Sequence, residues 1–272
     1  MVKPTLTHAQ SNGVTFWTDS ELFDAHHVRI AFSERGGGIS KEPYRSLNLA
    51  AHVGDEPAAV DENRDRLFDA CGMRDLRRRL VTAEQVHGDR IVTVGAHEAG
   101  AGALVSGGTA PVAACDGLAT THRDLPLMLL FADCVPVVLV APGPAVCVVH
   151  AGWRGALARI VSAGVTRVCE LSGAPATEVR AYIGAHIGGC CYPVDERNLS
   201  LFVNTFDTLA RAESGGLDLG YVVAASLTHV GVDPCNIARL GTCTAETTDR
   251  FFSYRAESGT TGRHGALVCI LG

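Results

Sequence analysis

The sequence has few charged residues, no long basic run and no long uninterrupted apolar stretch. Charged residues make up 19% of the 272 residues, and the formal net charge is −6. The chain therefore lacks the excess of lysine and arginine that is typical of nucleic-acid-binding proteins. The one short basic cluster, residues 74–79, is interpreted as the solvated face of a helix. The most apolar region is interrupted by Asp133, Pro136 and Pro142, which argues against a membrane span. We therefore expect no nucleic-acid partner and no membrane partner.

The first residues of the chain also lack the apolar core of a signal peptide. This absence predicts a cytoplasmic location, where thiols stay reduced. The ten cysteines therefore indicate free thiols or a metal site rather than a disulfide framework. Most of them lie in apolar runs, as Cys147, Cys169 and Cys269 do, and are expected to be small core residues.

The apolar pattern predicts an α/β fold in which strands and helices alternate. Hydrophobic residues make up 47% of the chain, enough for a sizeable core. Apolar runs bounded by Pro, Gly or polar residues predict strands at residues 28–32, 125–131, 135–140, 145–149, 179–183 and 266–271, and two more between residues 80 and 94. Helical spacing predicts helices within residues 56–80, after His150 as far as Leu171, at residues 199–210, and at residues 219–230 with Asp218 as N-cap.

Three side chains of metal-binding types lie where predicted strands end. Cys134 and His150 each adjoin an apolar strand, and His87 stands beside Gly88 at the break between two predicted strands. Sheet ends hold ligand sites in α/β proteins because strands fix the position and loops expose the side chain. The three residues are far apart along the chain, unlike the short pairings of structural zinc motifs. Spacing alone therefore leaves two interpretations open, a shared metal site and, for His87, an ordinary surface-turn histidine.

Polar residues lie in two further segments suited to an anion or a sugar. Arg45, Ser46 and Asn48 lie in a predicted loop or edge strand, and are either ligand contacts or turn residues that bond neighbouring backbone. Arg154 lies at the start of the helix that follows His150, where free backbone N–H groups and the helix dipole favour an anion. The pattern therefore favours an anion site near His150.

A series of short motifs is spread over the chain in a fixed order. They are Y-x-S-L-N at residues 44–48, H-V-G-D at 52–55, Q-V-H-G at 85–88, A-D-C-V-P at 132–136, H-A-G-W-R-G at 150–155, I-G-x-x-I-G-x-C-C-Y at 183–192, C-T at 243–244 and F-F-S-Y-R at 251–255. In this combination they resemble the YfiH or laccase-domain family, also called multicopper polyphenol oxidase-like proteins. The resemblance runs from about residue 28 to the C-terminus.

The resemblance implies a domain organisation and a fold. We expect an N-terminal extension at residues 1–27, partly strand or disordered, and a YfiH-like laccase domain at residues 28–272. The family fold is a single α/β domain of the α/β/β/α sandwich type, in which layered sheets are flanked by helices. This expectation agrees with the alternation of strands and helices described above.

Carried over by position, the family's metal ligands are His87, Cys134 and His150. The resemblance implies zinc at this site, with copper as the other possible metal. Two histidines and one thiolate leave a fourth position open for water or substrate, as in catalytic zinc sites.

The resemblance also implies several activities: phosphorolysis of adenosine, inosine and methylthioadenosine, adenosine deamination, polyphenol oxidation, and hydrolysis of a cell-wall (peptidoglycan) precursor. Multicopper phenol oxidation needs an axial methionine and further histidine-rich motifs. The chain has three Met and no H-x-H pair, so we favour nucleoside chemistry. In deamination a zinc-bound water attacks C6 of adenosine, whereas phosphorolysis needs a phosphate held beside C1′ of the ribose.

Arginines are the expected phosphate contacts because the guanidinium group binds phosphate oxygens in pairs. The predicted site residues are the catalytic group Cys134, His150 and Arg45 and the substrate-binding group Ser46, Asn48, Arg154 and Arg255. The expected partners are a small-molecule nucleoside and phosphate, bound by a monomer or a small homo-oligomer.

Two functions of other classes are also considered. One is a hydrolase in which His150 activates Cys134 as the nucleophile, and it predicts activity without metal. The other is a non-catalytic partner of cell-division or cell-wall enzymes, and it predicts that the metal-loaded protein turns over no nucleoside.

Overall fold

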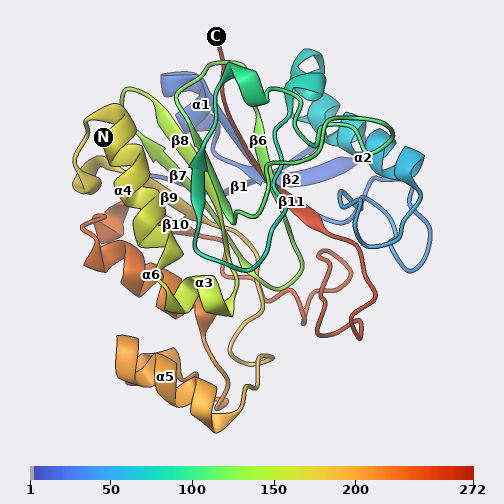
Figure 1. Cartoon of the computed structure of the whole chain (residues 1–272). Helices are drawn as coiled ribbons and strands as arrows, with labels where there is room; N and C mark the ends of the chain where they lie inside the picture. The colour runs from blue at the N-terminus through green and yellow to red at the C-terminus, as the bar shows by residue number, and fades with distance from the viewer. Residues whose placement is uncertain (1–2) are drawn as a thin grey trace.

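Two stacked β-sheets lie between layers of helices in the computed structural model, which describes residues 3–272 (Figure 1). The first sheet is antiparallel throughout, in the order β1 (Thr7–Ser11), β2 (Val14–Thr18), β3 (Val28–Ser33), β11 (His264–Ile270) and β6 (Leu127–Phe131). The second sheet has the order β10 (Ile237–Arg239), β9 (Arg180–Ile183), β7 (Val135–Ala141), β8 (Ala145–Ala151), β5 (Gly117–Thr120) and β4 (Ile91–Thr93). Its outer pairs, β10 with β9 and β4 with β5, are parallel, and its inner pairs are antiparallel.

Helices cover the outer faces of both sheets. The α-helices are α1 (Ser20–His26), α2 (Pro57–Ala70), α3 (Trp153–Leu157), α4 (Ile160–Ser172), α5 (Glu196–Phe206) and α6 (Leu219–His229). Short 3-10 helices are η1 (Arg74–Arg79), η2 (Ala96–Glu98), η3 (Ala176–Glu178), η4 (Thr208–Ala210) and η5 (Pro234–Asn236). Helices α3, α4 and α6 lie on the side of the second sheet, and α2 lies on the opposite side of the molecule (Figure 1). No helix within residues 3–272 is long and apolar enough to cross a membrane.

Alternate residues of the central strands face different cores. In β8, Val149 packs under the helices, and Val148 packs between the two sheets. In β6, Leu129 packs between the sheets, and Leu130 packs with the residues of the α2 side. Successive side chains of a strand point to opposite faces, so His150 lies on the same face of β8 as Val148 and points between the sheets. The fold therefore fixes the direction of one candidate ligand.

This architecture confirms the predicted α/β/β/α sandwich with layered sheets flanked by helices. Strands β7 and β8 are buried at every residue, and apart from His150 their sequences are continuous apolar runs, which made these strands easy to predict. Strands β1 and β2 lie within the predicted N-terminal extension, and β2 pairs with β3. Residues 1 and 2 lie outside the described part of the chain, and the division of the chain at residues 27 and 28 stays a prediction.

The prediction of one helix from His150 to Leu171 was wrong, because the helix breaks at Arg159. This residue has left-handed backbone dihedrals (φ 58°) and separates α3 from α4. Its guanidinium lies 4.4 Å from the ring centroid of Phe206 and donates to the carbonyl oxygen of Thr205 at 3.2 Å. The break is therefore held by contacts with α5, which local helical spacing does not reveal.

The prediction of two strands between residues 80 and 94 was right for the second strand and wrong for the first. Only β4 forms there, with isolated bridges at Val81 and Ala83. The backbone N–H groups of residues 86–88 donate to the carboxylate of Asp116 at 2.8–3.1 Å instead of to a neighbouring strand. A side chain thus takes the place of a β-ladder at this point.

Candidate metal centre

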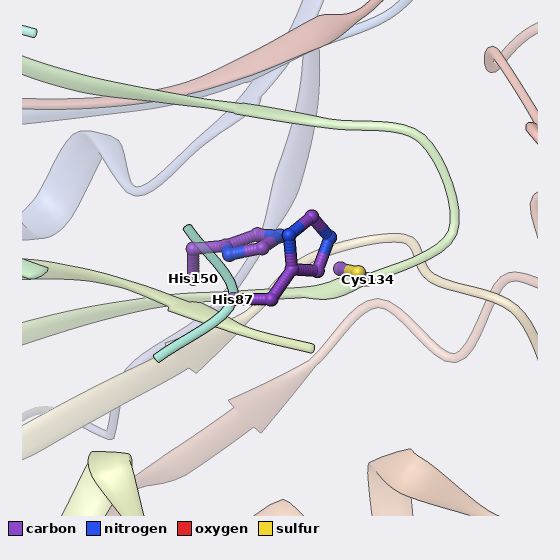
Figure 2. Close-up of side chains that lie close together, drawn as sticks. All are labelled: His87, Cys134 and His150. Atoms are coloured by element: carbon purple, nitrogen blue, oxygen red, sulfur yellow. The ribbon is translucent and has the colours of Figure 1, made fainter. Parts of the chain in front are cut away.

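His87, Cys134 and His150 come together at one end of the two sheets. His87 lies in the loop before β4, Cys134 in the turn between β6 and β7, and His150 near the end of β8. One ligand atom of each lies within 4.8 Å of the others. The two imidazole rings are nearly perpendicular, with centroids 4.9 Å apart, and the Cys134 sulfur lies beside the His87 ring (Figure 2). The fold thus assembles three residues that sequence spacing did not.

The turn that carries Cys134 crosses from the first sheet to the second. Asp133 adopts a positive φ of 86° in this turn, which reverses the chain before β7. Its carboxylate accepts the hydroxyl of Thr244 at 2.7 Å and the backbone N–H of Arg255 at 2.7 Å. These two bonds tie the turn to the loops that carry Thr244 and Arg255. They therefore restrict the position of Cys134, the next residue of the turn.

Asp116 holds the two candidate histidine ligands in place. It is fully buried, and its Oδ1 lies 2.7 Å from Nδ1 of His150 and accepts the backbone N–H of His87 at 3.0 Å. Its Oδ2 accepts the backbone N–H groups of Val86 and Gly88. Burial raises the pKa of the Asp116 carboxyl, but the bonds from His150 and Gly88 outweigh burial and lower it. The carboxylate therefore leaves Nε2 of His150 available to a metal, a common arrangement around histidine ligands.

Cys134 and His150 shift each other's pKa in opposite directions. Burial raises the pKa of the Cys134 thiol, but the charges of His150 and His87 and hydrogen bonds with them outweigh burial and lower it to about 6. Burial lowers the pKa of His150, but Cys134 and the hydrogen bond with Asp116 outweigh burial and raise it to about 9. The three residues thus hold a thiolate that is stabilised by neighbouring positive charge.

The space between these residues suits a metal ion. A Cβ on Gly152 would lie 3.0 Å from Cδ2 of His87, 3.2 Å from the Cys134 sulfur and 3.6 Å from Cε1 of His150. The absence of a side chain at Gly152 therefore leaves the gap between the three ligands unfilled. Nitrogen, sulfur and nitrogen donors match zinc, and they also suit copper. The residues present therefore fit the metal that the sequence predicts.

The candidate metal centre opens into a cavity of about 500 Å³. His150 is buried, Cys134 is half-buried and His87 is exposed, so the centre is reached from the His87 side. The other lining residues are His52, Gln85, Leu130, Ala132, Asp133, Trp153, Arg154, Tyr192, Tyr254, Arg255 and Arg263. Most of the polar groups among them are cationic or aromatic, which suits an anion and a flat ring.

Each arginine of the cavity lies over an aromatic ring. Arg154 lies over Trp153 at 4.5 Å, Arg255 over Tyr192 at 5.2 Å and Arg263 over Tyr254 at 5.7 Å from the ring centroid. Such contacts position the guanidinium groups without neutralising their charge. The cavity therefore presents positive charge and flat apolar surface side by side.

Of the predicted site residues, Arg154 and Arg255 line this cavity, whereas the predicted catalytic Arg45 and the predicted substrate-binding residues Ser46 and Asn48 do not. The side chain of Arg45 is 74% exposed, with Glu42 as its neighbour at 4.0 Å. Ser46 donates to the carbonyl oxygen of Arg35 at 3.0 Å, as a turn residue does. Roles for these residues in substrate binding stay predictions.

Asn48 is fully buried. Its side-chain oxygen accepts the backbone N–H of Arg263 at 2.9 Å, and its amide donates to Asp55 at 2.8 Å. Asn48 therefore contacts the segment that carries a lining arginine. Its direct contact with a sugar or base stays a prediction.

Sequence reasoning assigned no role to several residues that form the site. Tyr192, Tyr254 and His52 lie within motifs quoted above, so their positions carried a signal that was not used. Arg263 and Asp116 lie outside every motif, and nothing in their local sequence marks them. Only the fold brings them to the centre.

The geometry defines an α/β protein with an open two-histidine, one-cysteine centre at the base of a cavity. The chain belongs to the family described as multi-copper polyphenol oxidoreductase laccase, whose model matches residues 29–271. This match confirms the resemblance on which the ligand assignment was based.

Two relatives align with most of the chain. A purine nucleoside phosphorylase of Corynebacterium glutamicum is 37% identical over 247 residues, which are 89% of this chain and 94% of the relative. A purine nucleoside phosphorylase of Streptomyces coelicolor is 38% identical over 248 residues, which are 89% of this chain and 96% of the relative.

Solved structures share the fold over nearly the whole chain. The crystal structure of YlmD from Geobacillus stearothermophilus has a TM-score of 0.87 at 33% identity and covers 97% of this chain and 98% of that chain. The crystal structure of a Bacillus licheniformis hypothetical protein, YfiH, has a TM-score of 0.86 at 31% identity and covers 96% of this chain and 97% of that chain. These similarities agree with the single α/β domain described above.

Proposed function

We propose that this protein is a zinc-dependent purine nucleoside phosphorylase. The observation that carries the proposal is the cavity, in which His87, Cys134 and His150 lie beside arginines and aromatic rings. The names of the relatives support the same class of substrate. We propose adenosine, inosine and methylthioadenosine as substrates and deamination of adenosine as an accompanying activity.

The cavity residues supply both positive charge for a phosphate and flat surfaces for a purine base. Arg154, Arg255 and Arg263 supply guanidinium groups that suit phosphate, the co-substrate that must approach C1′ of the ribose. The rings of Trp153 and Tyr192 offer flat surfaces to the purine base. Asp116 keeps the His150 ring in one orientation, so that the position of its free nitrogen does not vary.

Zinc is the proposed metal, held by His87, Cys134 and His150. When bound, it would supply a Lewis acid at the base of the cavity. Electron-transfer copper sites add a weak axial methionine to two histidines and a cysteine. No methionine is among the described residues that line this cavity, so the site favours zinc over laccase-like copper chemistry.

Product analysis with and without phosphate tests the proposed function. Zinc-loaded protein is incubated with adenosine or inosine, and the products are separated by chromatography. We expect free base and ribose 1-phosphate only when phosphate is present. Inosine formed from adenosine without phosphate would support the accompanying deamination. Release of free base at the same rate without phosphate, or no release at all, would contradict phosphorolysis.

Arginine variants assign the phosphate contact. We expect Arg154→Ala, Arg255→Ala and Arg263→Ala to weaken phosphorolysis about tenfold to a hundredfold, the value of a charge-assisted contact. Arg45→Ala tests the sequence-based prediction for Arg45 in the same assay. Because its side chain is exposed outside the cavity, we expect a smaller loss than for the lining arginines. The reverse order would assign the phosphate to Arg45.

A second function, a cysteine hydrolase, is favoured by one observation. The Cys134 sulfur and a ring nitrogen of His150 lie within 4.8 Å of each other, and the lowered pKa of Cys134 with the raised pKa of His150 suits the pairing of a cysteine nucleophile with a cationic imidazole. This function requires no metal. Full activity towards a cell-wall precursor after complete removal of the metal would establish it in place of the phosphorylase.

We also propose that the protein is cytoplasmic and that it is a monomer or a small homo-oligomer.

A further inference from the structure

A second group of thiols lies outside the candidate metal centre. The sulfur atoms of Cys190, Cys191 and Cys243 lie within 4.8 Å of one another, and all three residues are free cysteines. Cys190 and Cys191 belong to the bend between β9 and α5, and Cys243 belongs to the loop after β10. We refer to these residues as the three-thiol cluster. The phosphorolysis proposed above does not use it.

Backbone contacts hold the two segments of the three-thiol cluster together. His186 forms a β-bridge with Cys243, and the carbonyl oxygen of His186 accepts the N–H of Thr244 at 3.0 Å. The N–H of Cys191 donates to the carbonyl oxygen of Gly188 at 3.0 Å, which closes the bend around the thiols. The three sulfurs are therefore brought together by ordered backbone on both sides.

Gly188 leaves space and supplies a hydrogen bond at the cluster. A Cβ at this residue would lie 3.0 Å from the Cys190 sulfur and 3.5 Å from the Cys243 sulfur. Its backbone N–H donates to the Cys243 sulfur at 3.2 Å. Hydrogen bonds from backbone N–H groups to sulfur stabilise thiolates that are bound to metal. Packing of three small side chains would by itself require neither the space at Gly188 nor its hydrogen bond to sulfur.

We propose that the three-thiol cluster binds one Cu(I) ion. Three thiolates form a soft donor set, and soft donors select Cu(I). With metal–sulfur bonds of about 2.3 Å, three sulfurs around one ion lie about 4 Å apart, so sulfurs within 4.8 Å need to move little. A structural zinc site without a bound water needs four protein ligands, and the described residues supply only three ligand groups to this cluster, the number that suits Cu(I).

The binding step is balanced without an oxidant. Each thiol releases its proton to solvent as its sulfur binds the ion, and copper stays in the +1 state. Cys190 is exposed, which gives the ion a path to the cluster. The inference rests on these residues alone and holds whether or not the protein acts on nucleosides.

Competition with a chromogenic Cu(I) chelator, bathocuproine disulfonate, tests the proposal. The full-length protein is reduced, kept free of oxygen and first saturated with zinc, so that the candidate metal centre is filled. We expect one further equivalent of Cu(I). Cys190→Ser, Cys191→Ser and Cys243→Ser should each weaken its binding about tenfold or more, since each removes one of three ligands. Cys235→Ser is the matched control, because Cys235 is an exposed thiol outside the cluster.

X-ray absorption at the copper edge gives a second measurement that does not depend on the folding of the variants. The proposal predicts three sulfur neighbours and no nitrogen neighbour around copper in the wild-type protein. Copper with nitrogen neighbours, lost in His87→Ala, would assign the ion to the candidate metal centre and overturn the proposal. Undiminished affinity in the three cluster variants, or retention of zinc in place of copper at these thiols, would also overturn it.

Discussion

Asp116 links two of the three candidate ligands, His87 and His150. One buried carboxylate contacts the ring of His150 and the backbone on both sides of His87. Without it, the loop that carries His87 loses the acceptor of its N–H groups. Metal binding would then have to order the His87 loop, which lowers the affinity for the metal.

Asp116→Asn should therefore weaken zinc binding about ten- to a hundredfold, because the amide cannot accept all the N–H bonds that the carboxylate accepts. Titration with a zinc chelator of known affinity measures the change. Asp89→Asn is the control, since Asp89 is an exposed carboxylate of the same loop. Equal zinc affinities for the wild type and Asp116→Asn would show that the carboxylate does not support the site.

Cys134 is expected to act as a ligand, so its thiolate should be shielded when zinc is bound. Iodoacetamide should label Cys134 slowly in the zinc-loaded protein and quickly after the zinc is chelated, because the lowered pKa leaves a reactive thiolate. Peptide mass spectrometry measures the labelled fraction at this residue. Fast labelling of the zinc-loaded protein, with loss of activity, would favour the cysteine hydrolase.

The sequence predicted the three ligands only through their motifs. His87, Cys134 and His150 stand in short, distinctive motifs, whereas without those motifs a surface-turn histidine was the favoured interpretation for His87. Asp116 had no such signal, because an isolated acidic residue before a strand is ordinary. Its role depends on hydrogen bonds to residues about thirty positions away, which no local pattern contains.

At the scale of elements, the close approach of α3 to the His87 loop shapes the site. Gly155 lies within α3, and a Cβ at this residue would lie 2.6 Å from the carbonyl oxygen of Gly88. The backbones of the helix and the loop therefore approach closely at Gly155 and Gly88. Any side chain at residue 155 would separate them.

Gly155→Ala should lower zinc affinity roughly tenfold or more, although alanine favours a helix over glycine by about 1 kcal/mol. The methyl group would displace the loop and, with it, His87. Isothermal titration with zinc measures the loss. Gly36→Ala is the control, since a Cβ there meets no atom within 4 Å. Wild-type affinity in Gly155→Ala would mean that the loop adapts without moving its ligand.

Elements were predicted well where one local property dominates and poorly where distant contacts do. Strands β7 and β8 are apolar apart from His150, and the Asp218 side chain caps α6 as expected. The break at Arg159 and the loop at residues 86–88 depend on partners in other elements. Local periodicity holds no information about such partners, so those segments were predicted as regular structure.

At the scale of the whole molecule, the two stacked sheets bring the site together. Cys134 lies where the chain passes from one sheet to the other, and His150 points between the sheets from β8. The lining of the cavity comes from loops, strand ends and the start of α3, spread between residues 52 and 263. The fold class followed from the sequence pattern and the resemblance, but the lining required the three-dimensional arrangement.

The stability of the whole fold should depend on pH through His264. This residue is buried at the start of β11, and among residues 3–272 neither ring nitrogen forms a hydrogen bond of normal geometry, although the backbone of Ala185 lies near the ring. Burial, followed by the charges of Arg263 and Arg35, lowers its pKa from 6.5 to about 3. Below pH 6.5 the unfolded chain therefore binds a proton at this residue that the folded chain does not, and the folded state loses stability as pH falls towards 3.

His264→Leu should reduce this dependence on pH. Between pH 6.5 and about pH 4.5, the free energy of unfolding of the wild type should fall more steeply than that of the variant, by up to about 1.4 kcal/mol per pH unit. Urea unfolding at several pH values measures both slopes. His97→Leu, at an exposed histidine, should leave the slope of the wild type nearly unchanged. Parallel slopes for the wild type and His264→Leu would contradict a neutral buried His264.

The central claim is that His87, Cys134 and His150 hold one metal ion at the base of the cavity. Crystals of the zinc-loaded protein, measured on both sides of the zinc absorption edge, test it most directly. We expect one anomalous peak per chain between Nε2 of His150, the sulfur of Cys134 and a ring nitrogen of His87, at about 2.0–2.3 Å from each. A zinc peak away from these residues, or no peak with Cys134 left unliganded, would contradict the account.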